Sequence, residues 1–270
     1  MGEAKKIIVK PISSKRARDI VKKFHYSGKV CNNSNFHLGV FYKGVLEGAI
    51  QFGPPIDKRK LIHLVPGTKW SQMLELNRMA FSDVLPRNSE SRAMGYVFKM
   101  LKKHRPDIKW VVSFSDATQC GDGVIYRASG FILSAIKRSD NLAKLPNGDV
   151  IHKMTLHSNP LKKRAELGNK SFYDVTGGKY NWKLYCKIAN AVILPGYQLR
   201  YIKFIDASWE KKLTVTPIPF NEIPTHVKMY KGKKIMRLPD KEASGDHPEK
   251  GGANPTQPLQ FLQVSNEKKK

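Results

Sequence analysis

The segment between residues 88 and 114 most constrains the fold. Ile108–Phe114 is a short, predominantly apolar run, and such a strand is typical of the middle of a sheet whose two faces are both covered. Before it, a helix is predicted to begin at Asn88 or Ser89 and to run to about His104, because apolar residues recur there at helical spacing until Pro106. A long helix followed directly by a buried strand predicts an α/β core.

The same reading gives the order of the other elements up to His157. A first helix is predicted after Ser13 or Ser14, and a short helix at Gly123–Ser129 that Gly130 closes. Ile56–Ser71 is expected to be an insertion with little regular structure. Strands are predicted in seven segments, giving the order β-α-β-β-(insertion)-β-α-β-α-β-β: Ile7–Ile12, Phe36–Tyr42, Val45–Phe52, Leu74–Phe81, Ile108–Phe114, Phe131–Ile136 and Ile151–His157.

The charge indicates the class of partner. Forty-eight Lys and Arg against 22 Asp and Glu give a formal net charge of +26, and such a field attracts polyanions and releases counterions from a phosphate backbone. The apolar fraction of 40% is enough for a core, so the chain is not a disordered polycation. Nucleic acid is therefore the expected partner. A membrane is not expected, because no segment combines a basic face with a continuous apolar one.

The cysteines and the N-terminus indicate the compartment. Cys31, Cys120 and Cys186 are scattered singly, which argues against a disulfide framework and favours a reducing cytoplasm. The first residues contain no apolar signal core. No Cys/His spacing suggests zinc, and we assign no metal.

The predicted order, with the Tyr126-x-x-x-Gly130-Phe131 turn after the fifth strand, resembles the GNAT acetyltransferase fold. The resemblance implies an α/β (α+β) protein with a mixed central sheet, whose fourth and fifth strands splay apart around the donor. The helix N-terminus beside this opening offers N–H groups to phosphates. Acetyl-CoA users usually have a glycine-rich loop there, whereas this chain has Pro86-Arg-Asn-Ser-Glu-Ser-Arg92 and so departs from a conventional CoA site.

A more specific resemblance is carried by motifs spread over about residues 7–235: His25-Tyr26-Ser27, Phe52-Gly53-Pro54, Glu75-Leu-Asn-Arg78, Asn88-Ser-Glu-Ser-Arg92, Ser115-Asp116, Gly123-x-Ile-Tyr126, Pro195–Asp206 and Leu213–Tyr230. Together they resemble the Mom family of phage and prophage DNA-modification enzymes. The resemblance implies conversion of adenine in double-stranded DNA to N6-(carbamoylmethyl)adenine in the cytoplasm of a bacterial host. This modification protects phage DNA from restriction.

Composition and resemblance together divide the chain into three expected parts. Residues 1–157 are expected to form the GNAT-like catalytic domain. Residues 158–237 are basic and rich in aromatic side chains, and we expect this extension to pack on the first part and to contact nucleic acid. Residues 238–270 are dominated by Pro, Gly, Lys and Glu, a composition typical of a disordered tail.

The resemblance implies catalytic roles for several residues. Tyr126 would protonate the leaving group, although a core tyrosine is the alternative. Asp116 follows a buried strand and would orient or deprotonate the adenine amine, or it caps an Asx turn. Arg78, a charge within a strand, would bind a donor phosphate or carbonyl oxygen, or pair with Glu75 or Asp116.

Two further groups are candidates for binding the reactants. Asn88, Ser89, Ser91 and Arg92 occupy the first turn of a helix and suit a phosphate or an oxyanion, with Ser91 a catalytic candidate; simple N-capping is the alternative. His25-Tyr26-Ser27 would border the acceptor, with Tyr26 stacking on a flipped base. Ordinary packing is the alternative there.

The donor and the rival functions remain open at the sequence level. The added group has the atoms of one glycine residue, so the donor is either acetyl-CoA followed by a further step, or glycyl-tRNA followed by rearrangement. The second route makes tRNA a partner. The rival functions are an acetyl-CoA-dependent N-acetyltransferase acting on protein or small-molecule amines, and a DNA-binding protein without catalysis.

Overall fold

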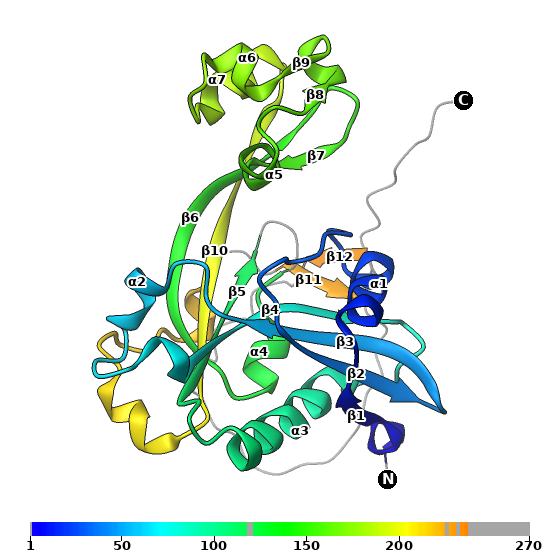
Figure 1. The fold of residues 1–270 in the computed structure, drawn as a ribbon, viewed down its shortest axis with the longest axis vertical. Helices are drawn as coiled ribbons and strands as arrows, with labels where there is room; N and C mark the ends of the chain where they lie inside the picture. The colour runs from blue at the N-terminus through cyan, green and yellow to red at the C-terminus, as the bar shows by residue number, and fades with distance from the viewer. Residues whose placement is uncertain (1, 118–120, 225–226, 231–232, 237–270) are drawn as a thin grey trace, which may run out of the picture. The chain divides into compact units, whose positions relative to one another are not determined.

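The computed structural model describes residues 2–117, 121–224, 227–230 and 233–236. Its centre is a mixed sheet of eight strands in the order β1-β2-β3-β4-β5-β10-β6-β7 (Figure 1). The strands of this sheet are β1 (Ile8–Pro11), β2 (Phe36–Tyr42), β3 (Val45–Gly53), β4 (Met73–Phe81), β5 (Trp110–Asp116), β6 (Ile132–Lys144), β7 (Val150–His152) and β10 (Val192–Phe204). The predicted mixed central sheet is confirmed.

Neighbouring strands are antiparallel except for β4 and β5, which are parallel. Their pairing joins only Met73–Glu75 to Trp110–Val112, although β4 continues to Phe81 and β5 to Asp116. The predicted splay of the fourth and fifth strands is thereby confirmed, and it leaves an opening in the sheet. We call it the β4/β5 opening.

Helices cover the two faces of the sheet. α1 (Ser14–Phe24) packs on β2, β3 and β4 from one side, and α3 (Ser89–His104) lies on the other (Figure 1). Ser13 caps α1 as predicted, because its side chain accepts a hydrogen bond from Arg16 N. The main apolar core lies between the sheet and α3, and a second core lies on the opposite face around Trp110.

A β-bulge decides which way the side chains of β4 point. The β3 pairing passes from Leu76 to Arg78 and leaves Asn77 as the extra residue. Leu76 belongs to the α3-side core, so regular alternation alone would place Arg78 on that side too. The extra residue instead turns Arg78 toward α1.

A glycine is required where α4 (Val124–Ala128) begins. Gly123 has φ +70°, and a Cβ atom there would collide with the ring and hydroxyl of Tyr201 on β10. Both the left-handed backbone and the close approach exclude other residues. Gly130, also left-handed, follows α4, as predicted.

The remaining short elements connect the sheet strands or lie beyond them. They are η1 (Glu3–Lys6), α2 (Lys58–Ile62), η2 (Trp70–Gln72), α5 (Lys153–Ser158), β8 (Lys163–Arg164), η3 (Ala165–Leu167), β9 (Lys170–Ser171), α6 (Phe172–Thr176), α7 (Trp182–Ile188), η4 (Ala207–Lys212), η5 (Phe220–Glu222), β11 (Val227–Tyr230) and β12 (Lys233–Met236).

Residues 158–237 contribute directly to the central sheet. β10 lies between β5 and β6 and pairs with both. The chain between the paired ends of β6 and β10 contains α5, α6 and α7 around an apolar cluster of its own. We call residues 145–191 the ribbon-tip module, because the long β6/β10 pair carries it (Figure 1). The predicted tail, 238–270, lies outside the described residues.

Two local predictions are wrong. Ile151–His157 is not one strand, because His152 accepts a hydrogen bond from Met154 N and starts α5. Ile56–Ser71 contains α2, which Asp57 caps. Of the described helices, none is long and apolar enough to span a membrane.

Candidate active site

Arg78 and Asp116 face the same side of the β4/β5 opening. Trp110 and Val112 of β5 belong to the core opposite α3, and alternation along the strand places Asp116 on that side too. The bulge turns Arg78 to the same side. The two residues that sequence reasoning chose on neighbouring strands are therefore brought to one face.

Arg78 ties β4 to the loop after α1. Its Nε donates to Lys29 O at 3.0 Å and its Nη1 to Asn77 O at 2.7 Å. The first of these bonds joins the loop to β4 at Lys29, and the second lies within β4 itself. The guanidinium also acts through charge, because it lowers the pKa of His25 and opposes the burial that raises the pKa of Glu75.

His25 is a neutral hydrogen-bond donor. Its Nδ1 accepts from Ser27 N at 3.2 Å and lies 2.8 Å from Ser27 Oγ, so the ring hydrogen is on Nε2. Burial, and secondarily the charge of Arg78, lowers the pKa of His25 to about 3. Tyr26 packs on the imidazole with a centroid distance of 4.3 Å and is 51% exposed.

His152 joins this group, and sequence reasoning missed it. Burial lowers its pKa, while the Asp116 carboxylate raises it and the charges of Lys29, Lys153 and Arg78 lower it further. Since Nδ1 accepts from Met154 N at 3.0 Å, the neutral ring carries its hydrogen on Nε2. A histidine at the start of a short helix has no sequence signal of function.

The ribbon-tip module contacts the loop after α1 through Thr155. Lys29 Nζ donates to Thr155 Oγ1 at 2.5 Å, and Arg164 donates to the Thr155 carbonyl at 3.3 Å. Burial and the charge of Arg164 lower the pKa of Lys29. The loop that carries His25 is therefore held between β4 and α5.

Tyr126 approaches the opening from the other side. Its hydroxyl lies 3.0 Å from Ser113 Oγ, which also donates to Leu76 O of β4 at 3.1 Å. The Tyr126 ring stacks on Tyr201 at 4.6 Å and packs edge-on against Phe131. Tyr126 is thus a tyrosine packed in the core whose hydroxyl reaches the point where β4 and β5 separate. Its role as a proton donor stays a prediction.

The first turn of α3 borders a hollow of about 330 Å³, which is lined by Gly2, Ala4, Lys5, Arg87, Asn88, Ser91, Arg92 and Ala128. Ser89 is not among these residues: it is buried, and its Oγ donates to Pro86 O at 2.6 Å. Asn88 is left-handed and makes no side-chain cap bond to a described residue. Ser91 Oγ donates to Asn88 O at 3.3 Å.

The hollow has the chemistry of an anion site. Lys5, Arg87 and Arg92 line it at the positive end of a 16-residue helix. Arg92 Nη2 donates to Tyr96 Oη at 2.7 Å, while its buried Nε has no hydrogen-bond partner in the described part of the chain. These residues fit the phosphates of a donor. Within the described ranges, no three His, Cys, Asp or Glu side chains are grouped to hold a metal ion.

Solved structures of acyl-transferring enzymes are similar to this chain at low sequence identity. The ribosomal-protein-S18-alanine N-acetyltransferase of Escherichia coli is 10% identical, with a TM-score of 0.39 over 74% of this chain and 94% of that one. The N-acyl amino acid synthase FeeM from uncultured soil microbes is 13% identical, with a TM-score of 0.41 over 77% and 95%.

Similarity at the sequence level identifies the family. The chain is 34% identical over 211 residues to methylcarbamoylase mom of Escherichia phage Mu, covering 78% of this chain and 80% of that protein. The model of the Mom protein family matches residues 6–222, a span that includes the β4/β5 opening, the first turn of α3 and the ribbon-tip module. The chain belongs to the Mom protein family.

Proposed function

We propose that this chain is a transferase that converts adenine in DNA to N6-(carbamoylmethyl)adenine. The observation that carries the proposal is that Arg78 and Asp116 face the same side of the β4/β5 opening, with His25 close enough to Arg78 to feel its charge. A separate cationic hollow lies at the first turn of α3. Family membership supports the assignment, and the name of the phage Mu relative, methylcarbamoylase, denotes transfer of a group that is an isomer of carbamoylmethyl.

The acceptor side suits an extruded purine. Adenine N6 is paired within the duplex, so the base must leave the stack, at a cost of about a few kcal/mol. Tyr26 offers an exposed ring for stacking, and neutral His25 offers Nε2–H to a ring nitrogen, with Ser27 fixing its orientation. Asp116 would orient or deprotonate the amine, which is a weak nucleophile because it is conjugated to the ring.

The α3 side suits the donor. Either candidate, glycyl-tRNA or acetyl-CoA, brings phosphates that Lys5, Arg87 and Arg92 would bind. Glycyl-tRNA would supply every atom of the added group: N6 would attack the ester carbonyl, the tRNA hydroxyl would leave, and the N6-glycyl product would rearrange to its carbamoylmethyl isomer. Acetyl-CoA would require a further step that supplies the nitrogen. Ser91 and Asn88 line the same hollow and would orient it, and Tyr126, whose hydroxyl reaches the opening, would protonate the leaving group.

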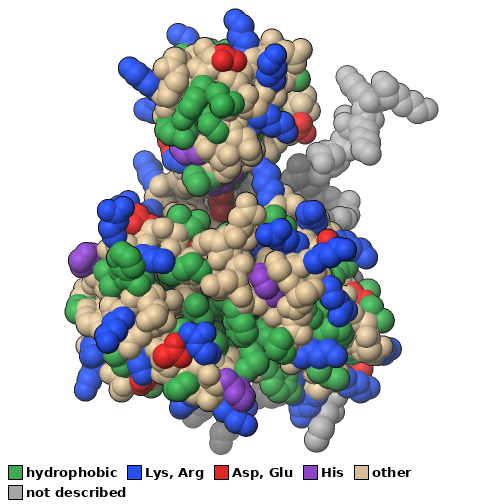
Figure 2. Space-filling model, viewed as in Figure 1, with side chains coloured by type: hydrophobic (Ala, Val, Ile, Leu, Met, Phe, Trp, Pro, Cys, Tyr) green, Lys and Arg blue, Asp and Glu red, His purple; other side chains and the backbone are tan. Residues whose placement is uncertain are grey.

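The surface charge suits the acceptor polymer. In the view of Figure 2, Lys and Arg side chains are spread over the visible face and far outnumber Asp and Glu. With a formal net charge of +26, this surface would attract DNA and stabilise the strained, unpaired substrate through backbone contacts.

Nucleoside mass spectrometry tests the proposal. DNA from cells that express the chain is digested and compared with DNA from cells that express Asp116→Asn at equal levels. We expect N6-(carbamoylmethyl)adenine only with the unaltered protein. Unmodified adenine in both samples contradicts the proposal. Isotope-labelled glycine and acetate, fed in parallel, identify the source of the transferred atoms.

A further inference from the structure

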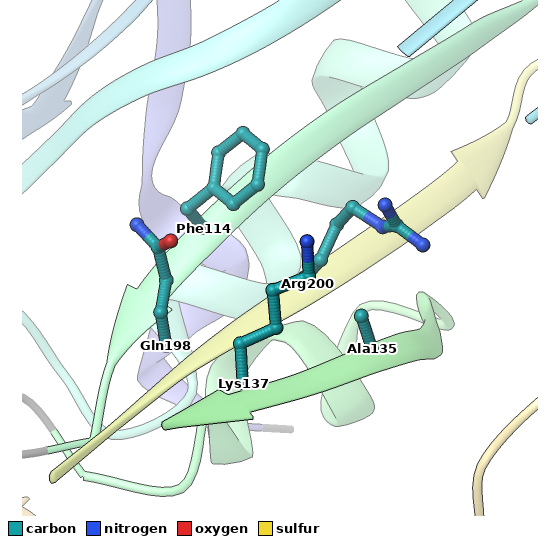
Figure 3. A pocket seen from close by; sticks show the side chains of 5 residues that line it. All are labelled: Phe114, Ala135, Lys137, Gln198 and Arg200. Carbon is teal, nitrogen blue, oxygen red and sulfur yellow. The ribbon is translucent and has the colours of Figure 1, made fainter. Parts of the chain in front are cut away.

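A second cationic hollow lies on the sheet beside Asp116. Five side chains from β5, β6 and β10 project to the same side of the sheet and line it (Figure 3): Phe114, Ala135, Lys137, Gln198 and Arg200. Its volume is about 60 Å³. We call it the β10 shelf. None of its residues belongs to the donor or acceptor groups described above.

The strand register places the β10 shelf next to the acceptor side. Gln198 pairs with Asp116, and Arg200 pairs with Phe114. Lys137 on β6 pairs with Gln198 from the other side. Directly paired residues point to the same face, about 5 Å apart. A row of side chains therefore runs from Asp116 through Gln198 to Lys137.

Arg200 is a half-buried cation that forms no salt bridge with any residue that the structure describes. Its Nε donates to Ser134 Oγ at 2.9 Å and its Nη2 to Ser134 O at 3.1 Å, at a bulge in β6. Burial is the cause that lowers its pKa. Among the salt bridges of the described residues, none includes Arg200 or Lys137. A desolvated charge in this position is costly unless an anion binds.

The size and lining of the β10 shelf select the anion. The hollow exceeds the roughly 10–15 Å³ that one water needs, yet it does not enclose a nucleobase. Lys137 and Arg200 supply two cations and Gln198 an amide donor, while Phe114 supplies an aromatic surface at the side. This combination is typical of surfaces that hold a phosphodiester while a neighbouring base stacks.

We propose that the β10 shelf binds a phosphodiester of the DNA strand that carries the target adenine, next to the extruded nucleotide. The inference rests on the proposed function and adds to it a backbone site that aligns the strand with Asp116. It also assigns Lys137, Gln198 and Arg200 to the acceptor strand, distinct from the donor phosphates bound at α3.

The test measures binding of unreacted nucleic acid by fluorescence anisotropy at several salt concentrations. The probes are a single-stranded DNA oligonucleotide, its duplex and an RNA of the same sequence. The variants are Lys137→Gln, whose side chain is exposed, and Arg200→Lys, which keeps the charge but loses the guanidinium fork. Lys102→Gln, an exposed lysine on α3, is the control of equal charge change.

We expect Lys137→Gln to weaken single-stranded DNA binding about threefold to tenfold relative to Lys102→Gln, and to reduce the salt slope by about 0.7. Arg200→Lys should weaken binding with little change in slope. Equal affinities and slopes for Lys137→Gln and Lys102→Gln overturn the inference, as does a loss confined to RNA. Because binding is measured without turnover, failure of the modification assay is distinguishable from failure at the shelf.

Discussion

The two sides of the β4/β5 opening are built differently. On the α1 side, charged and polar groups from β4, β5, the loop after α1 and α5 meet. The loop is held there by the hydrogen bonds from Arg78 to Lys29 O and from Lys29 Nζ to Thr155 Oγ1. On the α3 side, Tyr126 is fixed by aromatic packing against Tyr201 and Phe131. One side is thus organised by charge and hydrogen bonds and the other by aromatic packing, so substitutions on the first should mainly lower activity and those on the second should also lower stability.

The largest expected effect is on the electrostatic side. Asp116→Asn removes the carboxylate that would act on the adenine amine, and modified adenine should fall at least 100-fold, as for loss of a general base. Nucleoside mass spectrometry measures it. Asp83→Asn, an exposed aspartate, is the control. If Asp116→Asn retains full modification, the carboxylate has no part in the reaction.

On the packed side, two stacked tyrosines allow activity and stability to be separated. Tyr126→Phe should reduce modification about 10- to 100-fold, because the ring stays packed while the hydroxyl is lost. Tyr201→Phe leaves the buried Asp122 carbonyl without the Tyr201 hydroxyl, so it should cost about 1–3 kcal/mol of unfolding free energy. Thermal melts and nucleoside analysis compare the two. If Tyr126→Phe lowers the free energy of unfolding but leaves modification unchanged, Tyr126 has only a structural role.

A smaller effect is expected on the pH dependence of folding stability, through His25 on the α1 side. The pKa of His25 is about 3 in the folded protein, below its unfolded value near 6.5. The unfolded chain therefore binds the proton first, and stability present above pH 6.5 is lost as pH falls toward 3, by up to about 1.4 kcal/mol per pH unit. Urea unfolding between pH 7 and 5 should show this loss. His25→Asn should flatten it, and an unchanged slope contradicts the assignment.

The smallest effect concerns the bond between the loop and the ribbon-tip module. Lys29→Met removes the hydrogen bond to Thr155 and should cost about 1 kcal/mol or less, because the lysine is exposed. Amide hydrogen exchange in α5 should become faster. Lys187→Met, exposed on α7 of the same module, should leave it unchanged. Equal exchange rates in both variants would show that the contact does not hold α5.

Local patterns in the sequence determined much of this protein. Helical spacing and Pro106 placed α3, the apolar run placed β5 at the centre of the sheet, and Gly123 and Gly130 marked the limits of α4. These features depend on neighbouring residues, whose spacing is visible in the chain. The charge likewise favoured a polyanionic partner without any knowledge of the fold.

Which residues share a face of the sheet depends on the three-dimensional fold. The bulge at Asn77 turns Arg78 toward Asp116, while alternation keeps Ser113, beside Tyr126, on the other side. The insertion of β10 beside β5 creates the β10 shelf, and the folding of the ribbon-tip module brings His152 near Asp116. The physical reason is that strand pairing and register join distant segments, and a single extra residue reverses the direction of every side chain after it.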